Sequence, residues 1–419
     1  MLPKSEFNKN VLTVMTGTGL AQVITLVFSP ILTRIFTPEE FGIFYLFSAL
    51  SDILVIPATG RLELAILIPE KKNEAANIFW AAGISSSIFS ILLLIFIYFF
   101  SANIGIWLGE PKLSQWLFFL PISIFIVGWL SSFHYWHNRF KRFKVLTGTK
   151  IAESTTNVST RIGLGFLKFG TGGLIVGTLL GRLATVLSYF YFFNKKDKIS
   201  FPRFRRKAVW KQIIRFKNFP KNMVPAGLFQ VGSLQIPNLL LNLFYTATVV
   251  GHFGFMNRIL RAPLGLLGRS FEEVFKQKAS EELRQFGHCK NIFSKTIKKL
   301  LAIAILPFLI FFFAAPWAFQ FIFGEEWVTA GIYAQIFTIP LFINFLTGSL
   351  ASIFYLKEKT KIFSMLNFLQ LSFVIFAFFI NNFYDWNSLT LIYWLAGAYT
   401  ISYLLTLFFL VKIVYEEEG

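Results

Sequence analysis

The feature that most constrains this chain is a series of apolar runs, each about 18 residues or longer, that recurs from one end of the sequence to the other. In lipid, every backbone N–H and C=O group needs a partner within the protein, and a helix supplies these partners within its own segment. The chain is therefore predicted to be an all-α integral membrane protein.

We predict about twelve transmembrane helices, joined by short connections on one side and longer basic loops on the other. The connections on the first side leave no room for a catalytic domain. The predicted spans are 11–34, 41–67, 76–101, 115–136, 150–168, 171–193, 222–244, 247–271, 297–323, 330–356, 361–381 and 389–412.

The positive charge is distributed unevenly between the two sides. The chain carries a formal net charge of +19, and most of its lysines and arginines fall in alternate loops and in the termini. Only Lys112 and Lys168 lie in loops on the opposite side. Such a bias matches the positive-inside rule, so we expect a multi-pass protein of the cytoplasmic membrane with both termini in the cytoplasm. A membrane surface, rather than a nucleic acid, explains the basic loops.

The longest basic loop divides the chain into two halves of six spans. We predict an N-terminal lobe at 1–200, a basic amphipathic cytoplasmic linker at 201–221 and a C-terminal lobe at 222–419. A weak internal repeat supports this division: Gly19-Leu-Ala-Gln-Val23 precedes Phe41-Gly-Ile-Phe44, and Gly227-Leu-Phe-Gln-Val231 precedes Val250-Gly-His-Phe253 at nearly the same interval. Because each half has an even number of spans, a pseudo-two-fold axis along the membrane normal is expected to relate them.

Arginine is the prominent charged residue within the spans. On a helix, Arg258, Arg261 and Arg269 fall within roughly 80° of one another. Such a stripe either lines a cavity or lies near the membrane surface, where the side chains reach lipid headgroups. Guanidinium groups bind phosphate with two hydrogen bonds and keep their charge, so the excess favours an anionic substrate. The candidate substrate-binding residues are Arg61, Arg161, Arg182, Arg258, Arg261 and Arg269.

A few acids accompany these arginines. Asp52 and Glu63 lie in one span that Pro57 and Gly60 are expected to break, and Glu153 belongs to a polar stripe in another. Each is either part of a structural ion pair or a carboxylate that couples transport to an ion. The spans contain no set of catalytic residues and no metal-binding cluster, so we expect neither an enzyme nor a cofactor.

Several segments carry a pattern of glycine, proline and charge. They are, in chain order, Ser29-Pro-Ile-Leu-Thr-Arg-Ile-Phe-Thr-Pro-Glu-Glu-Phe-Gly42, Ala58-Thr-Gly-Arg-Leu-Glu-Leu-Ala65, Gly173-Leu-Ile-Val-Gly177, Phe219-Pro-Lys-Asn-Met-Val-Pro225, Val250-Gly251 leading to Arg258 and Pro263, and Phe271-Glu-Glu-Val-Phe275. These segments resemble Wzx-type polysaccharide flippases, which transport O-antigen and other lipid-linked oligosaccharides and belong to the polysaccharide transport branch of the multidrug/oligosaccharidyl-lipid/polysaccharide (MOP) exporter superfamily. The similar segments cover the first two thirds of the chain.

The resemblance implies a MATE-like fold with a cationic central cavity. It also implies that the protein turns a polyprenyl-pyrophosphate-linked oligosaccharide from the cytoplasmic to the outer leaflet of a bacterial inner membrane. Arg61, Arg258 and Arg261 would line the cavity, and Asp52 and Glu63 would couple the step to an ion gradient. Membrane lipids, a polysaccharide polymerase and chain-length machinery are the expected partners, and lipopolysaccharide O-antigen, capsule or exopolysaccharide the expected product.

Two alternatives remain from the sequence. A cation-coupled drug or metabolite antiporter of the same superfamily would need an acidic cavity, and the arginine excess argues against it. A non-transporting or enzymatic membrane component of polysaccharide assembly is the other. A polymerase or ligase needs larger outer loops than this chain has.

Overall fold

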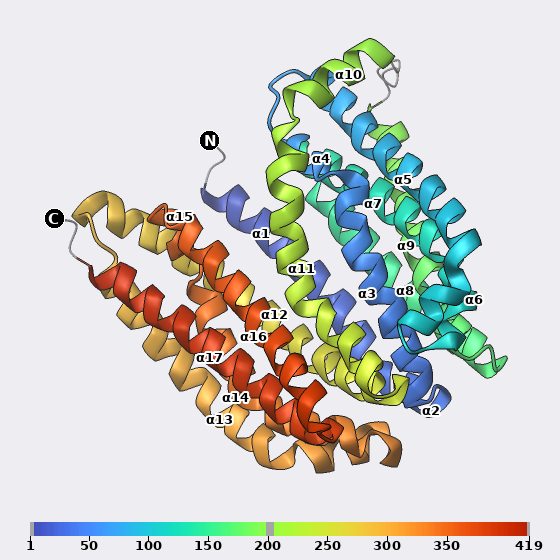
Figure 1. Ribbon diagram of the computed structural model, residues 1–419. Helices are drawn as coiled ribbons and strands as arrows, with labels where there is room; N and C mark the ends of the chain where they lie inside the picture. The colour runs from blue at the N-terminus through green and yellow to red at the C-terminus, as the bar shows by residue number, and fades with distance from the viewer. Residues whose placement is uncertain (1–3, 198–204, 417–419) are drawn as a thin grey trace. The chain divides into compact units, whose positions relative to one another are not determined.

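The computed structural model describes residues 4–197 and 205–416, and within these ranges all of the regular secondary structure is helical (Figure 1). The α-helices are α1 (Lys4–Val27), α2 (Ser29–Ile35), α3 (Pro38–Thr59), α4 (Leu62–Ala65), α5 (Lys72–Trp107), α6 (Ser114–Leu117), α7 (Leu120–Arg139), α8 (Phe143–Phe166), α9 (Thr171–Asp197), α10 (Arg206–Arg215), α11 (Asn218–Phe244), α12 (Ala247–Phe286), α13 (Lys290–Phe323), α14 (Val328–Leu350), α15 (Ile353–Leu356), α16 (Thr360–Tyr384) and α17 (Ser388–Tyr415). Short 3-10 helices cover Pro111–Leu113 and Glu325–Trp327.

Each of the predicted spans falls on one of these helices or on a pair that a short break separates. In the described ranges, eight helical segments are long and apolar enough to cross a membrane, and nine if the bent pair Pro111–Leu117 and Leu120–Arg139 counts as one span. The remaining predicted spans correspond to α8, α11 and α12. These three helices carry many polar side chains. Exposing such side chains to lipid costs much more free energy than placing them inside a helix bundle. The all-α membrane fold is confirmed.

The chain forms two compact units, residues 1–251 and 252–419. Helix α11 follows the basic linker in sequence, yet it packs along α3 within the first unit. The boundary between the compact units thus follows Gly251 in the sequence, and the division into lobes at 201–221 stays a prediction.

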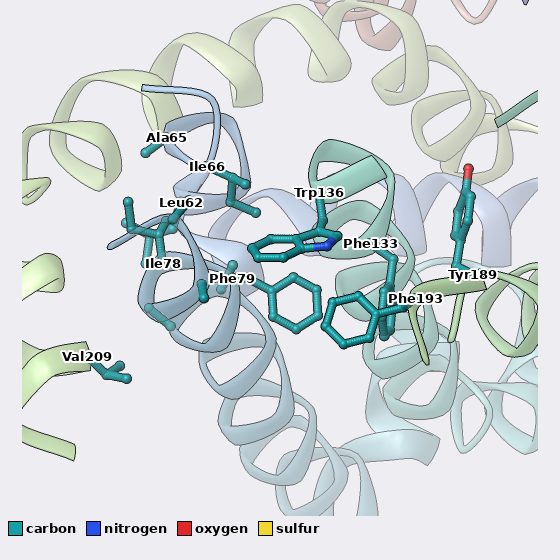
Figure 2. Close-up of a cluster of buried hydrophobic side chains, with 14 of the residues drawn as sticks. Leu62, Ala65, Ile66, Ile78, Phe79, Phe133, Trp136, Tyr189, Phe193 and Val209 are labelled. Carbon is teal, nitrogen blue, oxygen red and sulfur yellow. The ribbon is translucent and has the colours of Figure 1, made fainter. Parts of the chain in front are cut away.

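In the first unit, aromatic rings pack around Phe79 of α5 (Figure 2). The ring centroid of Phe79 lies 5.0 Å from that of Phe133, 5.7 Å from that of Trp136 and 6.0 Å from that of Phe193. Aromatic pairs at such separations add to the free energy gained by burial. This cluster ties α5, α7 and α9 together and holds the short helix α4 against them through Leu62.

Two glycines let the beginnings of α3 and α12 touch backbone to backbone within the first unit. A Cβ atom on Gly42 would overlap the carbonyl oxygen of Ala247, and one on Gly251 would overlap that of Pro38. The contact is reciprocal: the first residue of each helix lies against the glycine that is four residues along the other helix. Gly42 and Gly251 are the glycines that the internal repeat pairs.

A capping box fixes the start of α3. The Thr37 backbone N–H donates to Oε2 of Glu40 at 2.8 Å, and the Glu40 N–H donates to the Thr37 hydroxyl at 3.3 Å. Pro38 follows at the first helical position, where its missing N–H costs nothing. These residues set the direction in which α3 enters the bundle.

Candidate functional site

The helix that carries Arg61 is broken, as Pro57 and Gly60 predict. Helix α3 ends at Thr59, and Gly60 and Arg61 both adopt the left-handed conformation, with φ of 59° and 56°. For arginine this conformation costs about 1–2 kcal/mol. A residue held there by its surroundings marks a position where the direction of the side chain matters.

The Arg61 guanidinium lies in a space that Gly227 of α11 leaves open. A Cβ atom at position 227 would be 2.7 Å from Nη2 and 2.9 Å from Nε of Arg61. On the other side, Nη1 lies 3.8 Å from Oε1 of Glu63, whose carboxylate is buried. On an unbroken helix, Glu63 would point away from Arg61, so the break is what brings this pair together.

Asp52 and Arg182 belong to one polar network in the first unit. An oxygen of Asp52 accepts a hydrogen bond from the Gln235 side chain at 2.9 Å, and the other oxygen lies 3.9 Å from Nη2 of Arg182. Arg182 also donates to the hydroxyl of Ser123 at 3.0 Å. The Asp52 side chain keeps 43% of its accessible surface. An accessible carboxylate with a nearby cation suits a group that exchanges partners.

Arg161 and Glu153 lie among structural contacts. Arg161 is 1% exposed; its guanidinium lies 4.6 Å from the Phe44 ring centroid and donates to the Thr178 hydroxyl at 2.6 Å. Glu153 pairs with Lys150 at 3.0 Å, one turn away on α8. These contacts join α8 to α3 and α9. The roles in substrate binding and ion coupling that the sequence suggests for these two residues stay predictions.

In the second unit, Arg261 and Arg269 line one cavity between α12 and α14. Its volume is about 280 Å³. Arg261 is half-buried, and its Nε donates to the Asn257 side chain at 3.0 Å. The lining residues are Arg261, Leu264, Gly265, Gly268, Arg269, Glu272, Leu341, Asn344, Phe345, Gly348 and Ser349.

Two arginines and one glutamate give this cavity a positive balance. The glycines on both walls leave its interior open, and Asn344 adds an amide opposite the arginines. Arg258 lies on α12 about one turn before Arg261 and is half-buried, but it does not line the cavity. The structure therefore brings two of the three stripe arginines into one cavity.

Sequence reasoning missed Gln235, Asn344 and Gly227. Gln235 and Asn344 are amide side chains within otherwise apolar stretches. An isolated amide in such a stretch is a sequence feature that could have identified them. Gly227 was noted as part of the repeat, but its contact with Arg61 depends on tertiary packing and has no local signature.

A family model described as "Polysaccharide biosynthesis protein" matches residues 31–331. The chain belongs to this family. The match begins within the segment 29–42, which resembles polysaccharide flippases. It confirms that resemblance. No curated protein sequence matches the chain.

Solved structures with a similar fold include flippases and transporters. A structure titled lipid II flippase MurJ in an inward closed conformation aligns with a TM-score of 0.76 at 14% identity, covering 96% of this chain and 90% of that one. An inward-facing multidrug resistance MATE transporter of the MOP superfamily aligns with a TM-score of 0.67 at 14% identity, covering 95% and 94%. A MOP superfamily transporter from Pyrococcus furiosus aligns with a TM-score of 0.64 at 14% identity, covering 97% and 96%. At these identities the likeness shows the fold alone.

Proposed function

We propose that this protein flips a polyprenyl-pyrophosphate-linked oligosaccharide from the cytoplasmic to the outer leaflet of the bacterial inner membrane, for assembly of a surface polysaccharide. The observation that carries this proposal is the cavity that Arg261 and Arg269 line in a member of the polysaccharide biosynthesis family. The fold, which MurJ and MATE transporters share, supports a transport function rather than an enzymatic one.

The chemistry of the cavity suits a lipid-borne pyrophosphate. Guanidinium groups stay charged and offer paired N–H donors to phosphate oxygens. Arg261 is half-buried and Arg269 is exposed, so a phosphate should interact more strongly with the partly shielded Arg261 than with Arg269. Glu272 offsets part of the positive charge, which keeps the site from holding an anion too tightly to release it. Transport requires a site that binds and then lets go.

Asp52 is our proposed coupling residue. Its carboxylate is accessible, and its contacts with Gln235 and Arg182 join α3, α11 and α9. Protonation, or binding of a cation, would remove the attraction between Asp52 and Arg182 and so change how these helices hold one another. Glu63 lies beside Arg61 and Glu153 pairs with Lys150, and both of these carboxylates are less accessible than that of Asp52, so we rank them after it.

The decisive experiment measures on which face of the membrane the lipid-linked oligosaccharide accumulates. Cells that lack the protein are treated with a membrane-impermeant reagent that modifies the glycan. We expect the glycan to be protected from the reagent in these cells and to become reactive when the intact chain is restored.

Variants then locate the site. Arg261→Ala combined with Arg269→Ala should insert normally but leave the glycan protected, whereas Arg261→Lys should retain part of the transport. Arg284→Ala, an exposed arginine farther along α12, serves as the matched control and should transport normally. Reactive glycan in the deletion strain, with no second transporter present, would rule out the flippase. Normal transport by the double variant would remove the cavity from the mechanism.

A further inference from the structure

A second cavity lies in the second unit, where the end of α12 packs against the beginning of α13. Its volume is about 540 Å³. It is separate from the cavity that Arg261 and Arg269 line, which we call the arginine cavity. The two cavities share helix α12 but no lining residue. The lining residues are Phe271, Val274, Phe275, Lys278, Ile292, Lys295, Thr296, Lys298, Lys299 and Ala302.

Four lysines surround this cavity and no acid does. All four are exposed, and within the described part of the chain none of them forms an ion pair. They are Lys278, Lys295, Lys298 and Lys299. An anion that enters the cavity would therefore meet four positive charges and no negative charge among the lining side chains. Lysine tolerates varied phosphate geometries because it acts as a point charge.

The cavity lies where α13 changes from a basic to an apolar stretch, which is the pattern expected of a helix that enters a bilayer at the headgroups. The helix is basic from Lys290 to Lys299 and almost entirely apolar from Leu300 to its end at Phe323. The apolar part leaves Ile303, Leu306 and Ile310 exposed, so a hydrocarbon chain that leaves the cavity meets an apolar surface. Phosphate at the lysines and acyl chains along this surface would follow the bilayer geometry.

We infer that this cavity, which we call the lysine cavity, binds an anionic glycerophospholipid of the cytoplasmic leaflet. The lipid phosphate lies among the four lysines, and an acyl chain passes Val274 and Ala302 onto the exposed face of α13. The inference rests on the positive-inside orientation but not on the flippase function. Because α12 also carries Arg261 and Arg269, the bound lipid would hold the helix that bears the substrate site at a fixed depth.

The test uses the full chain, purified in neutral detergent and titrated with a phosphatidylglycerol that has a fluorescent acyl chain. One variant replaces the four lysines by glutamine (Lys278→Gln, Lys295→Gln, Lys298→Gln and Lys299→Gln). The matched control removes the same charge from exposed lysines of the first unit (Lys207→Gln, Lys211→Gln, Lys217→Gln and Lys221→Gln). We expect affinity to fall about tenfold or more in the first variant and less than about twofold in the control.

A third variant separates the cavity from surface charge. Val274→Trp fills the space and leaves every lysine in place, so it should weaken phosphatidylglycerol binding about fivefold or more without changing the salt dependence. Thermal unfolding of each variant checks that it is folded. Labelled phosphatidylcholine should bind the intact chain and all variants equally weakly.

Three results would overturn the inference. Equal losses in the two glutamine variants would show attraction to general surface charge. Unchanged binding by the Val274→Trp variant would show that the cavity is not used. Displacement of the labelled lipid by undecaprenyl pyrophosphate, at concentrations far below those of unlabelled phosphatidylglycerol that achieve the same effect, would assign the lysine cavity to the transported lipid. Normal flipping by a lipid-binding-deficient variant would leave the proposed function intact.

Discussion

The crossing of α3 and α12 yields the sharpest prediction about folding. Gly42→Ala would place a methyl group where the Ala247 carbonyl oxygen lies, and Gly251→Ala would do the same to the Pro38 carbonyl. A flexible side chain could move away, but these oxygens belong to helix backbones. Each alanine must therefore push the helices apart, and overpacking of this kind costs about 1–3 kcal/mol.

The same substitution should have the opposite sign where the glycine has room. Gly163 lies within α8, and apart from the nearby backbone of α8 itself no atom lies within 4 Å of a Cβ atom built there. Alanine is favoured over glycine in helices by roughly 0.5–1 kcal/mol. Gly163→Ala is thus expected to be neutral or to stabilise the protein, while the two crossing variants lose stability.

The assay is reversible unfolding of the purified chain in mixed micelles of neutral detergent and dodecyl sulfate, followed by circular dichroism. The double variant is informative as well, since a Cβ atom on Gly251 would lie 3.2 Å from the Gly42 nitrogen. Once one alanine has separated the helices, the second should cost less than it does alone. Free energies of unfolding for Gly42→Ala and Gly251→Ala that equal or exceed that of the unmodified chain would refute the close crossing.

Three further predictions concern single contacts. Arg161→Lys should lower the free energy of unfolding by about 2 kcal/mol, because the planar contact with Phe44 is desolvated; an unchanged midpoint with lost transport would instead make Arg161 a substrate ligand. Gly227→Leu should displace the Arg61 guanidinium and reduce transport more than stability, and equal losses in both would indicate a packing role alone. Burial raises the pKa of the Cys289 thiol, so a maleimide at pH 7 should react at least about tenfold faster with the unfolded chain than with the native one, and the native rate should rise with pH.

Much of the architecture could be predicted from the sequence because lipid restricts the choice so severely. A long apolar run has few alternatives to a spanning helix, and the bias of basic residues predicts which loops share a side. The break after Thr59 was also predictable, since Pro57 removes a helical hydrogen bond and Gly60 accepts a left-handed conformation. These are local effects, which the sequence carries directly.

The site was predictable only in part. Helical spacing predicts a stripe of Arg258, Arg261 and Arg269; Arg261 and Arg269 line one cavity, and Arg258 on the same helix does not. Arg161 belongs to a similar polar stripe and lies buried against Phe44. Periodicity assigns residues to a face of a helix, but it does not say whether that face meets a cavity or a neighbouring helix.

A pair of matching dipeptides illustrates the same limit. Gly60-Arg61 and Gly268-Arg269 are separated by the interval that separates Gly19 from Gly227. The first pair interrupts a helix, while α12 runs unbroken through the second. The surroundings account for the difference: at the first pair, Gly227 makes room for the Arg61 guanidinium and Glu63 lies close by, whereas the second pair opens into the arginine cavity. Because the same dipeptide adopts two conformations in one chain, the dipeptide alone does not determine its backbone conformation, and the surrounding side chains must supply the difference.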